Sequence, residues 1–203
     1  MKSRTIIRCA HVAALLLLAS ALTPVRADPG ENGWLGVYFD AAGTQCSGTI
    51  LPDQPGTVYV VAQANGVTAT EGFAGAEFRF TGIPESWATY PVANPEILAI
   101  GNPFGDGVAT AFPCPESDTY VLYSVLVIAS AVEEDLQFEL RNREPPTNPN
   151  FDCPLLMLCN NPIFTLICVE TVPCFVNAAT ARKCEFPVAV SPSTWSGVKS
   201  LFR

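Results

Sequence analysis

Short runs of apolar and β-branched residues alternate with turn-forming residues along most of this chain. In the run Glu77-Phe78-Arg79-Phe80 the aromatic positions alternate with charged ones, and residues 136–141 have the same period of two. This period places apolar side chains on the core face of a sheet and polar side chains toward water. The predicted strands span residues 34–39, 45–50, 57–64, 76–81, 108–112, 120–130 and 136–141.

Turn residues separate these strands at intervals that are typical of an all-β fold. Glycine, proline, aspartate and asparagine cluster at 40–43, 52–56, 65–66 and 102–107, where they favour tight turns. No sustained helical period interrupts residues 28–185, so alternating strands and helices are not expected. The sequence therefore predicts an antiparallel β-sandwich of the immunoglobulin-like or jelly-roll type.

A proline-rich stretch divides the chain after the last of these strands. Residues 143–152 contain three prolines and no apolar period, which predicts a stiff linker. It separates a predicted sandwich domain at 28–142 from a cysteine-rich extension at 153–190. Two further strands are expected within the extension, at 163–170 and 172–176. Because a segment of this size can bury little apolar surface by itself, we expect disulfides to hold it together.

The C-terminal tail, residues 191–203, is predicted to form a short helix. Ser193 can cap this helix, and Trp195, Val198 and Phe202 fall on one helical face. A helix of this length is unstable alone in water. The tail is therefore expected either to dock on the body of the protein or to be bound by a partner.

The first 27 residues have the pattern of a secretory signal peptide. Lys2, Arg4 and Arg8 precede an apolar run at 12–22, and Val25 and Ala27 place small or apolar residues at positions −3 and −1 of a cleavage site before Asp28. The apolar run is shorter than the ~20 residues of a membrane-spanning helix, although an uncleaved anchor is the alternative. We expect a secreted, periplasmic or cell-surface protein with no membrane span once the signal is removed.

Charge excludes one large class of partner. The 203 residues include 11 Lys and Arg and 19 Asp and Glu, for a net charge of −8. Four of the basic residues and none of the acidic ones lie in residues 1–27, so the remaining chain carries 7 basic residues against 19 acidic ones. Nucleic-acid binding requires a basic surface. We therefore expect no nucleic-acid partner.

The single histidine, His11, lies in the predicted signal peptide. A mature chain without histidine cannot form a Ser-His-Asp triad, a Cys-His pair or a His-ligated zinc site. The chemistry that remains is a pair of carboxylates acting on a glycosidic bond. The densest carboxylate cluster is Glu133-Glu134-Asp135, which is more typical of a solvated turn between strands.

We expect no cofactor, with Ca²⁺ as the alternative, because oxygen ligands could bind it without histidine. Two groups of residues could contribute such ligands. The first is Asp28, Glu31 and Asn32, and the second is Asn102 and Asp106.

Seven cysteines in an exported chain indicate disulfides in an oxidising compartment. The candidates are Cys46, Cys114, Cys153, Cys159, Cys168, Cys174 and Cys184. Because seven is odd, one cysteine is left unpaired or bridges to another molecule. We expect Cys168 and Cys174 to face each other across a turn at 170–172. A zinc site is the less favoured alternative, since the cysteine spacings are wider than usual and no histidine is available.

Two aromatic residues in a predicted loop are candidates for ligand contact. Trp87 and Tyr90 lie between predicted strands, where binding residues tend to occur, and exposed aromatic rings can stack on a sugar or a protein surface. The alternative is that these rings fold down onto the sandwich.

Three segments of the predicted sandwich resemble a known family. They are Gly75–Gly82, Gly107–Phe112 and Tyr120–Ala129. Their pattern resembles the middle strands of cohesin-like and related carbohydrate-module sandwiches. The resemblance covers residues 34–141, and the cysteine-rich extension departs from it. It implies a non-catalytic module that binds protein or polysaccharide at the cell envelope.

The segment Thr194–Arg203 resembles short tails on uncharacterised secreted bacterial proteins. Together these observations lead us to expect a non-enzymatic binding or structural module. The alternative function is a carboxylate-dependent hydrolase that acts on polysaccharide.

Overall fold

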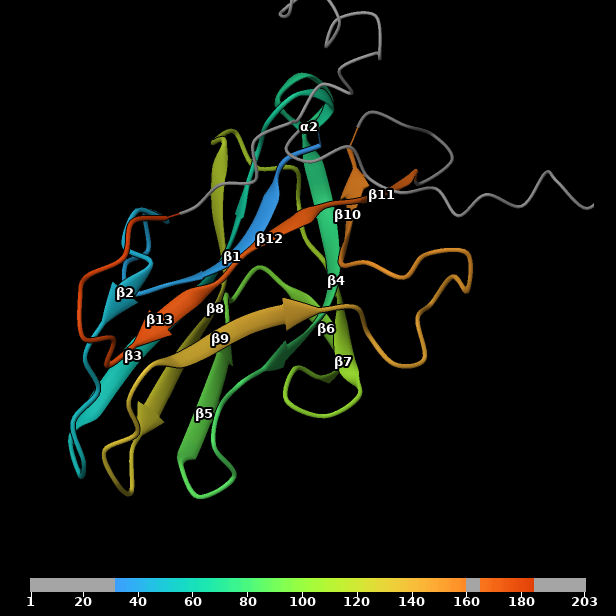
Figure 1. The fold of residues 1–203 in the computed structure, drawn as a ribbon. Helices are drawn as coiled ribbons and strands as arrows, with labels where there is room; N and C mark the ends of the chain where they lie inside the picture. The colour runs from blue at the N-terminus through green and yellow to red at the C-terminus, as the bar shows by residue number, and fades with distance from the viewer. Residues whose placement is uncertain (1–31, 160–164, 185–203) are drawn as a thin grey trace, which may run out of the picture.

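The structure, a computed structural model, describes residues 32–159 and 165–184 and consists of two β-sheets packed face to face (Figure 1). The elements are β1 (Trp34–Tyr38), β2 (Ser47–Gly48), β3 (Pro55–Gln63), α2 (Val67–Glu71), β4 (Phe73–Thr81), β5 (Ala88–Ala93), β6 (Leu98–Asn102), β7 (Gly107–Ala111), β8 (Thr119–Ile128), β9 (Leu136–Arg141), β10 (Leu155–Leu158), β11 (Leu166–Cys168), β12 (Glu170–Val172) and β13 (Cys174–Val176). The predicted signal peptide and the predicted tail helix lie outside the described residues. The expected all-β sandwich is confirmed.

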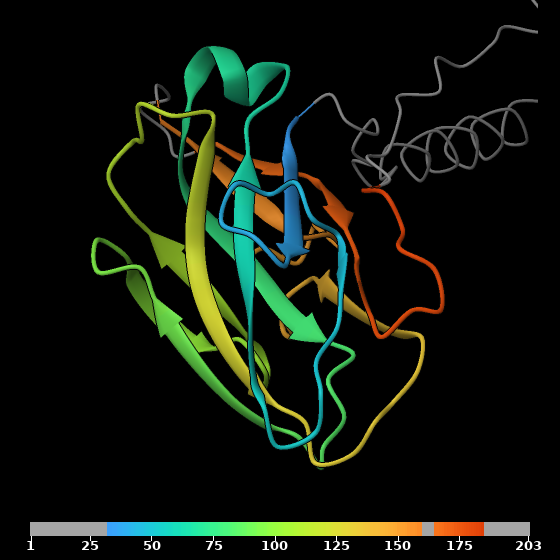
Figure 2. The same cartoon turned by 90° about the vertical axis from the view of Figure 1, so that its left-hand side faces the viewer.

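One sheet has five strands in the order β12-β1-β3-β8-β5. Figure 2 shows β1, β3, β8 and β5 side by side across this sheet. The pairings within it are antiparallel except that β12 joins β1 in parallel. The long β3–β8 pair at the centre runs from Pro55 opposite Ile128 to Gln63 opposite Thr119.

The other sheet is built around β4. Its strands follow the order β11-β10-β4-β9-β13-β2, while β7 pairs with the other edge of β4 and β6 pairs with β7. Phe73–Glu77 of β4 pair with β10, whereas Arg79–Thr81 pair with β9. Strands β10 and β9 therefore follow one another along a single edge of β4.

The cysteine-rich segment supplies strands to both sheets. Strands β10, β11 and β13 belong to the eight-stranded sheet, and β12 belongs to the five-stranded sheet. The chain crosses between the sheets at Pro173, which lies between β12 and β13. The connection at 143–152 is held to the eight-stranded sheet, since the Thr147 amide donates to Glu77 Oε1 at 2.9 Å.

Aromatic and aliphatic side chains from both sheets form one main core. Phe78, Phe138 and Leu122 are completely buried. The Phe138 ring lies between two other rings, with the Trp87 centroid 6.3 Å away in an edge-to-face arrangement and the Phe80 centroid 5.7 Å away. Such pairs add to the stability that burial of the ring area already provides.

Several strands differ from the sequence-based prediction. Strands β5 and β6 lie at edges of their sheets and were not predicted as strands. All five residues of β6 are exposed and β5 is mostly exposed, so neither strand shows the alternation that indicates one buried face. Pro91 within β5 also argues against a strand, although proline is tolerated at a sheet edge. Strand β2, predicted to span 45–50, is only two residues long.

Candidate binding surface

Six of the seven predicted disulfide cysteines are paired. The bonds are Cys46–Cys184, Cys114–Cys159 and Cys153–Cys168. Cys174 is free and buried. The expected Cys168–Cys174 pair is therefore wrong.

The predicted Cys168–Cys174 bond is wrong because the chain does not turn back on itself after Cys168. Residues 170–172 form strand β12 in the other sheet rather than the turn of a hairpin. Cys174 begins β13 and pairs with Phe138 on β9, so its side chain lies in the core. Cys168 instead stands opposite Leu155 in the β10–β11 ladder, close to Cys153.

The buried thiol of Cys174 gives a prediction about reactivity. Burial raises the pKa of Cys174 to about 12, so at pH 8 the group stays protonated and sealed from solvent. Because the thiolate is the reactive form, we expect a chain lacking residues 1–27 to take up no thiol reagent while folded. In denaturant, mass spectrometry should show one label per chain. A Cys174→Ser variant is the control and should take up none, whereas rapid labelling of the folded protein would contradict this result.

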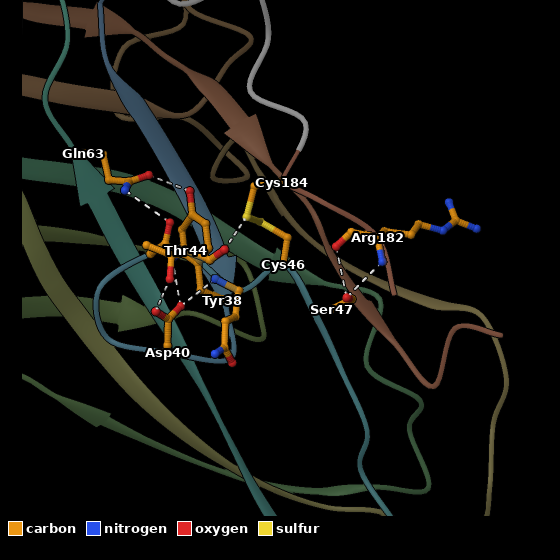
Figure 3. Close-up of a disulfide and its surroundings, with 10 residues drawn as sticks. Tyr38, Asp40, Thr44, Cys46, Ser47, Gln63, Arg182 and Cys184 are labelled. Carbon is orange, nitrogen blue, oxygen red and sulfur yellow. Dashed lines mark hydrogen bonds between the residues drawn. A yellow bond between two sulfur atoms is a disulfide. The ribbon is translucent and has the colours of Figure 1, made fainter. Parts of the chain in front are cut away.

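The Cys46–Cys184 bond holds a loop against the outer side of the five-stranded sheet (Figure 3). Asp40 orders this loop, because its carboxylate accepts hydrogen bonds from the Thr44 and Gln45 amides at 2.8 and 2.7 Å and from the Thr44 hydroxyl at 2.6 Å. Partial burial alone would raise the pKa of Asp40, but these hydrogen bonds outweigh it and lower the pKa. The carboxylate thus fixes the turn that leads into Cys46.

Tyr38 lies beneath this loop and links it to β3. Its hydroxyl donates to Gln63 Oε1 at 2.8 Å, and Gln63 Nε2 donates to the Gly43 carbonyl at 3.3 Å (Figure 3). Burial, aided by the negative charges possible at Asp40 and Cys174, raises the pKa of Tyr38. The hydroxyl therefore remains a neutral hydrogen-bond donor, and this corner is structural rather than reactive.

The loop covers only part of the sheet. Beneath it, Tyr38 of β1, Val61 of β3 and Val172 of β12 form a second buried cluster together with Cys46 of the loop itself. Figure 2 shows the loop crossing in front of β1 and β3, while β8 and β5 stay uncovered on that side.

The uncovered part presents three rows of side chains across β3, β8 and β5. The rows follow from the registers of the two ladders, and the residues between them on β3 and β8, such as Val58, Val125 and Val127, are buried. We call this surface the uncharged face. It consists of Pro55, Thr57, Tyr59, Ser124, Leu126, Ile128, Ala88, Tyr90 and Val92.

No member of the uncharged face is an ionisable acid or base at neutral pH, although the protein has 19 acidic and 11 basic residues. Val92 is 63% exposed and Tyr90 is 56% exposed. Protein interfaces are depleted of charge and enriched in tyrosine at their centre, and contiguous exposed apolar side chains mark interaction sites. The face is therefore the best candidate binding surface among the described residues.

The two predicted contact residues have different environments. Trp87 is only 5% exposed, and its ring packs on the ring of Phe138. The prediction that Trp87 contacts a ligand is corrected accordingly, since its ring belongs to the core. Tyr90 was expected in a loop but lies on strand β5, where it is an exposed member of the uncharged face. The other members of this face were not identified from the sequence, because only strand pairing brings them together.

Two more exposed apolar side chains lie on a separate strand. Leu98 and Ile100 of β6 are 67% and 65% exposed. They stand opposite Ala111 and Ala109 of β7 in the eight-stranded sheet. They therefore provide a comparison site of similar exposure on the other sheet.

The candidate sites for other chemistry are dispersed. Glu133, Glu134 and Asp135 are exposed between β8 and β9. Asp135 forms an ion pair with Arg182, with 3.6 Å between Asp135 Oδ1 and Arg182 Nη2. Asn102 accepts a hydrogen bond from the Phe104 amide within the β6–β7 turn. Across residues 32–159 and 165–184, no three His, Cys, Asp or Glu side chains are grouped to hold a metal ion.

In the same parts of the chain, no helix has the length and hydropathy needed to cross a bilayer.

Comparison with protein-family models and with curated protein sequences found no match. Solved structures, in contrast, share the fold. A cohesin module from a family 33 glycoside hydrolase of Clostridium perfringens has a TM-score of 0.51 and 9% identity, over 73% of this chain and 98% of that module. The seventh ScaB type I cohesin from Pseudobacteroides cellulosolvens has a TM-score of 0.46 and 11% identity, over 75% and 96% of the two chains. The chain therefore has a cohesin-like β-sandwich fold.

Proposed function

We propose that this chain is a non-catalytic, exported module that binds a partner protein through the uncharged face. The observation that carries the proposal is a continuous set of nine uncharged residues on β3, β8 and β5, with Tyr90 and Val92 exposed at its edge. In a protein this acidic, such an area is unfavourable in water unless it is covered. A protein surface is the partner that matches its extent over three strands and its lack of charge.

The disulfides support an oxidising, extracytoplasmic location for this function. The cohesin-like fold is compatible with a binding role, since the Clostridium perfringens structure is a module of a larger enzyme. A polysaccharide ligand is less well supported, because Trp87 is buried, which leaves Tyr90 as the exposed one of the two rings predicted to stack on a ligand. We therefore place the cell-envelope partner among proteins rather than glycans, and we assign no catalytic role to the exposed carboxylates.

A charge placed in the uncharged face tests this proposal. Purified chain is immobilised, proteins of the source cell envelope are captured, and the retained partner is identified and titrated. We expect Val92→Lys to lower the affinity for that partner at least about tenfold, because the lysine ammonium group must be desolvated in the interface.

Leu98→Lys is the matched control, since it makes the same change at an equally exposed strand position on the other sheet. It should leave the titration unchanged, and both variants should keep the melting temperature of the parent. Equal affinity of the Val92 variant and the parent would refute the proposal, as would an equal loss in both variants. Failure of the parent to retain any protein would refute a protein partner altogether.

A further inference from the structure

Strand β6 is an open edge of the eight-stranded sheet. It pairs with β7 on one side, and no described strand lies on its other side. All five of its residues, Leu98–Asn102, are exposed, so the backbone on its free side is accessible. A row of unpaired backbone N–H and C=O groups of this kind is a template on which another chain can add a strand.

The other edge strands that the structure describes are shorter or interrupted. Strands β2, β11 and β12 have two or three residues each, and β5 contains Pro91. Short strands, proline, charged side chains and bulges are the devices that prevent edges from associating. Strand β6 has five residues, no proline and no charge, and its register with β7 is unbroken. Among the described edges it is therefore the one best suited to add a strand.

Two apolar side chains strengthen this suitability. Leu98 and Ile100 are about two-thirds exposed and, two residues apart, they lie on the same face of the strand. Their neighbours across the ladder are Ala111 and Ala109, whose single methyl groups cover little of them. A strand added on the free side would bury part of both side chains, and exposed apolar side chains grouped in this way mark interaction sites.

The sequence of β6 is complementary to itself. If two copies pair antiparallel about the central residue, the two Ile100 side chains stand opposite each other, and Leu98 of each copy lies diagonally beside them. Ala99 then stands opposite Gly101, and Leu98 stands opposite Asn102. No charged residue enters this register, although the chain as a whole is acidic. A two-fold symmetric interface requires a self-complementary patch of this kind.

We propose that the chain forms a weak symmetric dimer in which β6 of one copy pairs antiparallel with β6 of the other. The two eight-stranded sheets then join through main-chain hydrogen bonds. Five residues a side are far fewer than the about 20–30 of a standard stable interface, so we expect a dissociation constant of about 0.1 mM. The contact lies on the other sheet from the uncharged face, and it does not depend on the partner proposed for that face.

Sedimentation equilibrium of a chain lacking residues 1–27, from low-micromolar to millimolar concentration, tests the proposal. We expect the parent to change from monomer to dimer across this range. Ile100→Lys should remain monomeric at millimolar concentration, because it places two ammonium groups opposite each other. Val92→Lys is the matched control, since it makes the same change at an equally exposed strand position on the other sheet. It should dimerise like the parent.

A mixture of Ile100→Lys and Ile100→Asp tests the register. Each variant alone should be monomeric, whereas the equimolar mixture should associate more than either, because lysine of one copy then faces aspartate of the other. Hydrogen exchange at the amides of β6 in the parent should be slower at millimolar than at low-micromolar protein concentration. At low-micromolar concentration, where the parent is itself monomeric, every variant should keep the parental melting temperature.

A parent that stays monomeric at millimolar concentration would overturn the proposal. So would dimerisation of Ile100→Lys, loss of the dimer in Val92→Lys, or a mixture no more associated than its two components. None of these measurements involves the captured partner, so this proposal and the proposed function can fail separately. The titration of that partner uses dilute, monomeric chain, so Leu98→Lys remains a valid control there although it lies on β6.

Discussion

Replacing Phe138 with alanine is expected to lower the free energy of unfolding by about 3–5 kcal/mol. The ring is completely buried between the two sheets, and its removal leaves a cavity beside Trp87 and Phe80. Strand β9 also connects β4 to β13, so it cannot move to fill the space without disturbing both ladders. A loss of this size is a large fraction of the stability of an ordinary domain.

Urea denaturation under oxidising conditions measures this effect. Gln137→Ala is the matched control on the neighbouring, exposed position, and it should change stability by no more than about 0.5 kcal/mol. Phe138→Leu should cost less than the alanine variant, because it retains most of the buried volume. If the alanine variant were as stable as the parent, the burial of the Phe138 ring between the two sheets would be wrong.

The double variant Cys46→Ser, Cys184→Ser is expected to lose about 2–4 kcal/mol. This bond joins residues 138 positions apart, so its removal greatly increases the freedom of the unfolded chain. The native loop would also lose the contact between Cys184 Sγ and the Thr44 carbonyl, now 3.2 Å. Changing both cysteines avoids leaving a reactive thiol.

The comparison is Cys153→Ser, Cys168→Ser, whose bond spans only 15 positions. In the chain-entropy account this pair contributes less than the long-range pair. Thermal unfolding of the two double variants, with the other bonds intact, should rank them in that order. The reverse order would show that native contacts around the shorter bond outweigh the entropy of the longer loop.

Strands with one buried face were predictable from the sequence. Strand β9 was predicted with its observed limits, 136–141, because Phe138 and Leu140 alternate with polar residues. Strands β5 and β6 were missed because an edge strand exposed on both faces has no reason to alternate. In the extension, the expected run 163–170 overlaps β11, but Glu170 begins a strand in the other sheet. Local pattern does not reveal which sheet a short strand joins.

The candidate surface was predictable only in part. Tyr90 was identified as an exposed aromatic residue, but the uncharged face depends on pairings between strands that are about 30 to 70 residues apart in the chain. Trp87 has the same sequence signal as Tyr90 and lies in the core, since an aromatic residue near a strand end can turn either way. Cysteine pairing has the same limitation, because Cys46 and Cys184 meet only once both sheets are formed.

The Cys46–Cys184 bond also determines how the protein would carry mechanical load. If the chain is pulled from both sides of its described part, tension passes from β1 through the loop to Cys46 and then directly across the sulfurs to Cys184. Residues 47–183, which include most of the core and the whole uncharged face, lie outside this path. A module anchored to a cell at one end and loaded at the other could therefore resist stretching while its recognition surfaces keep their shape.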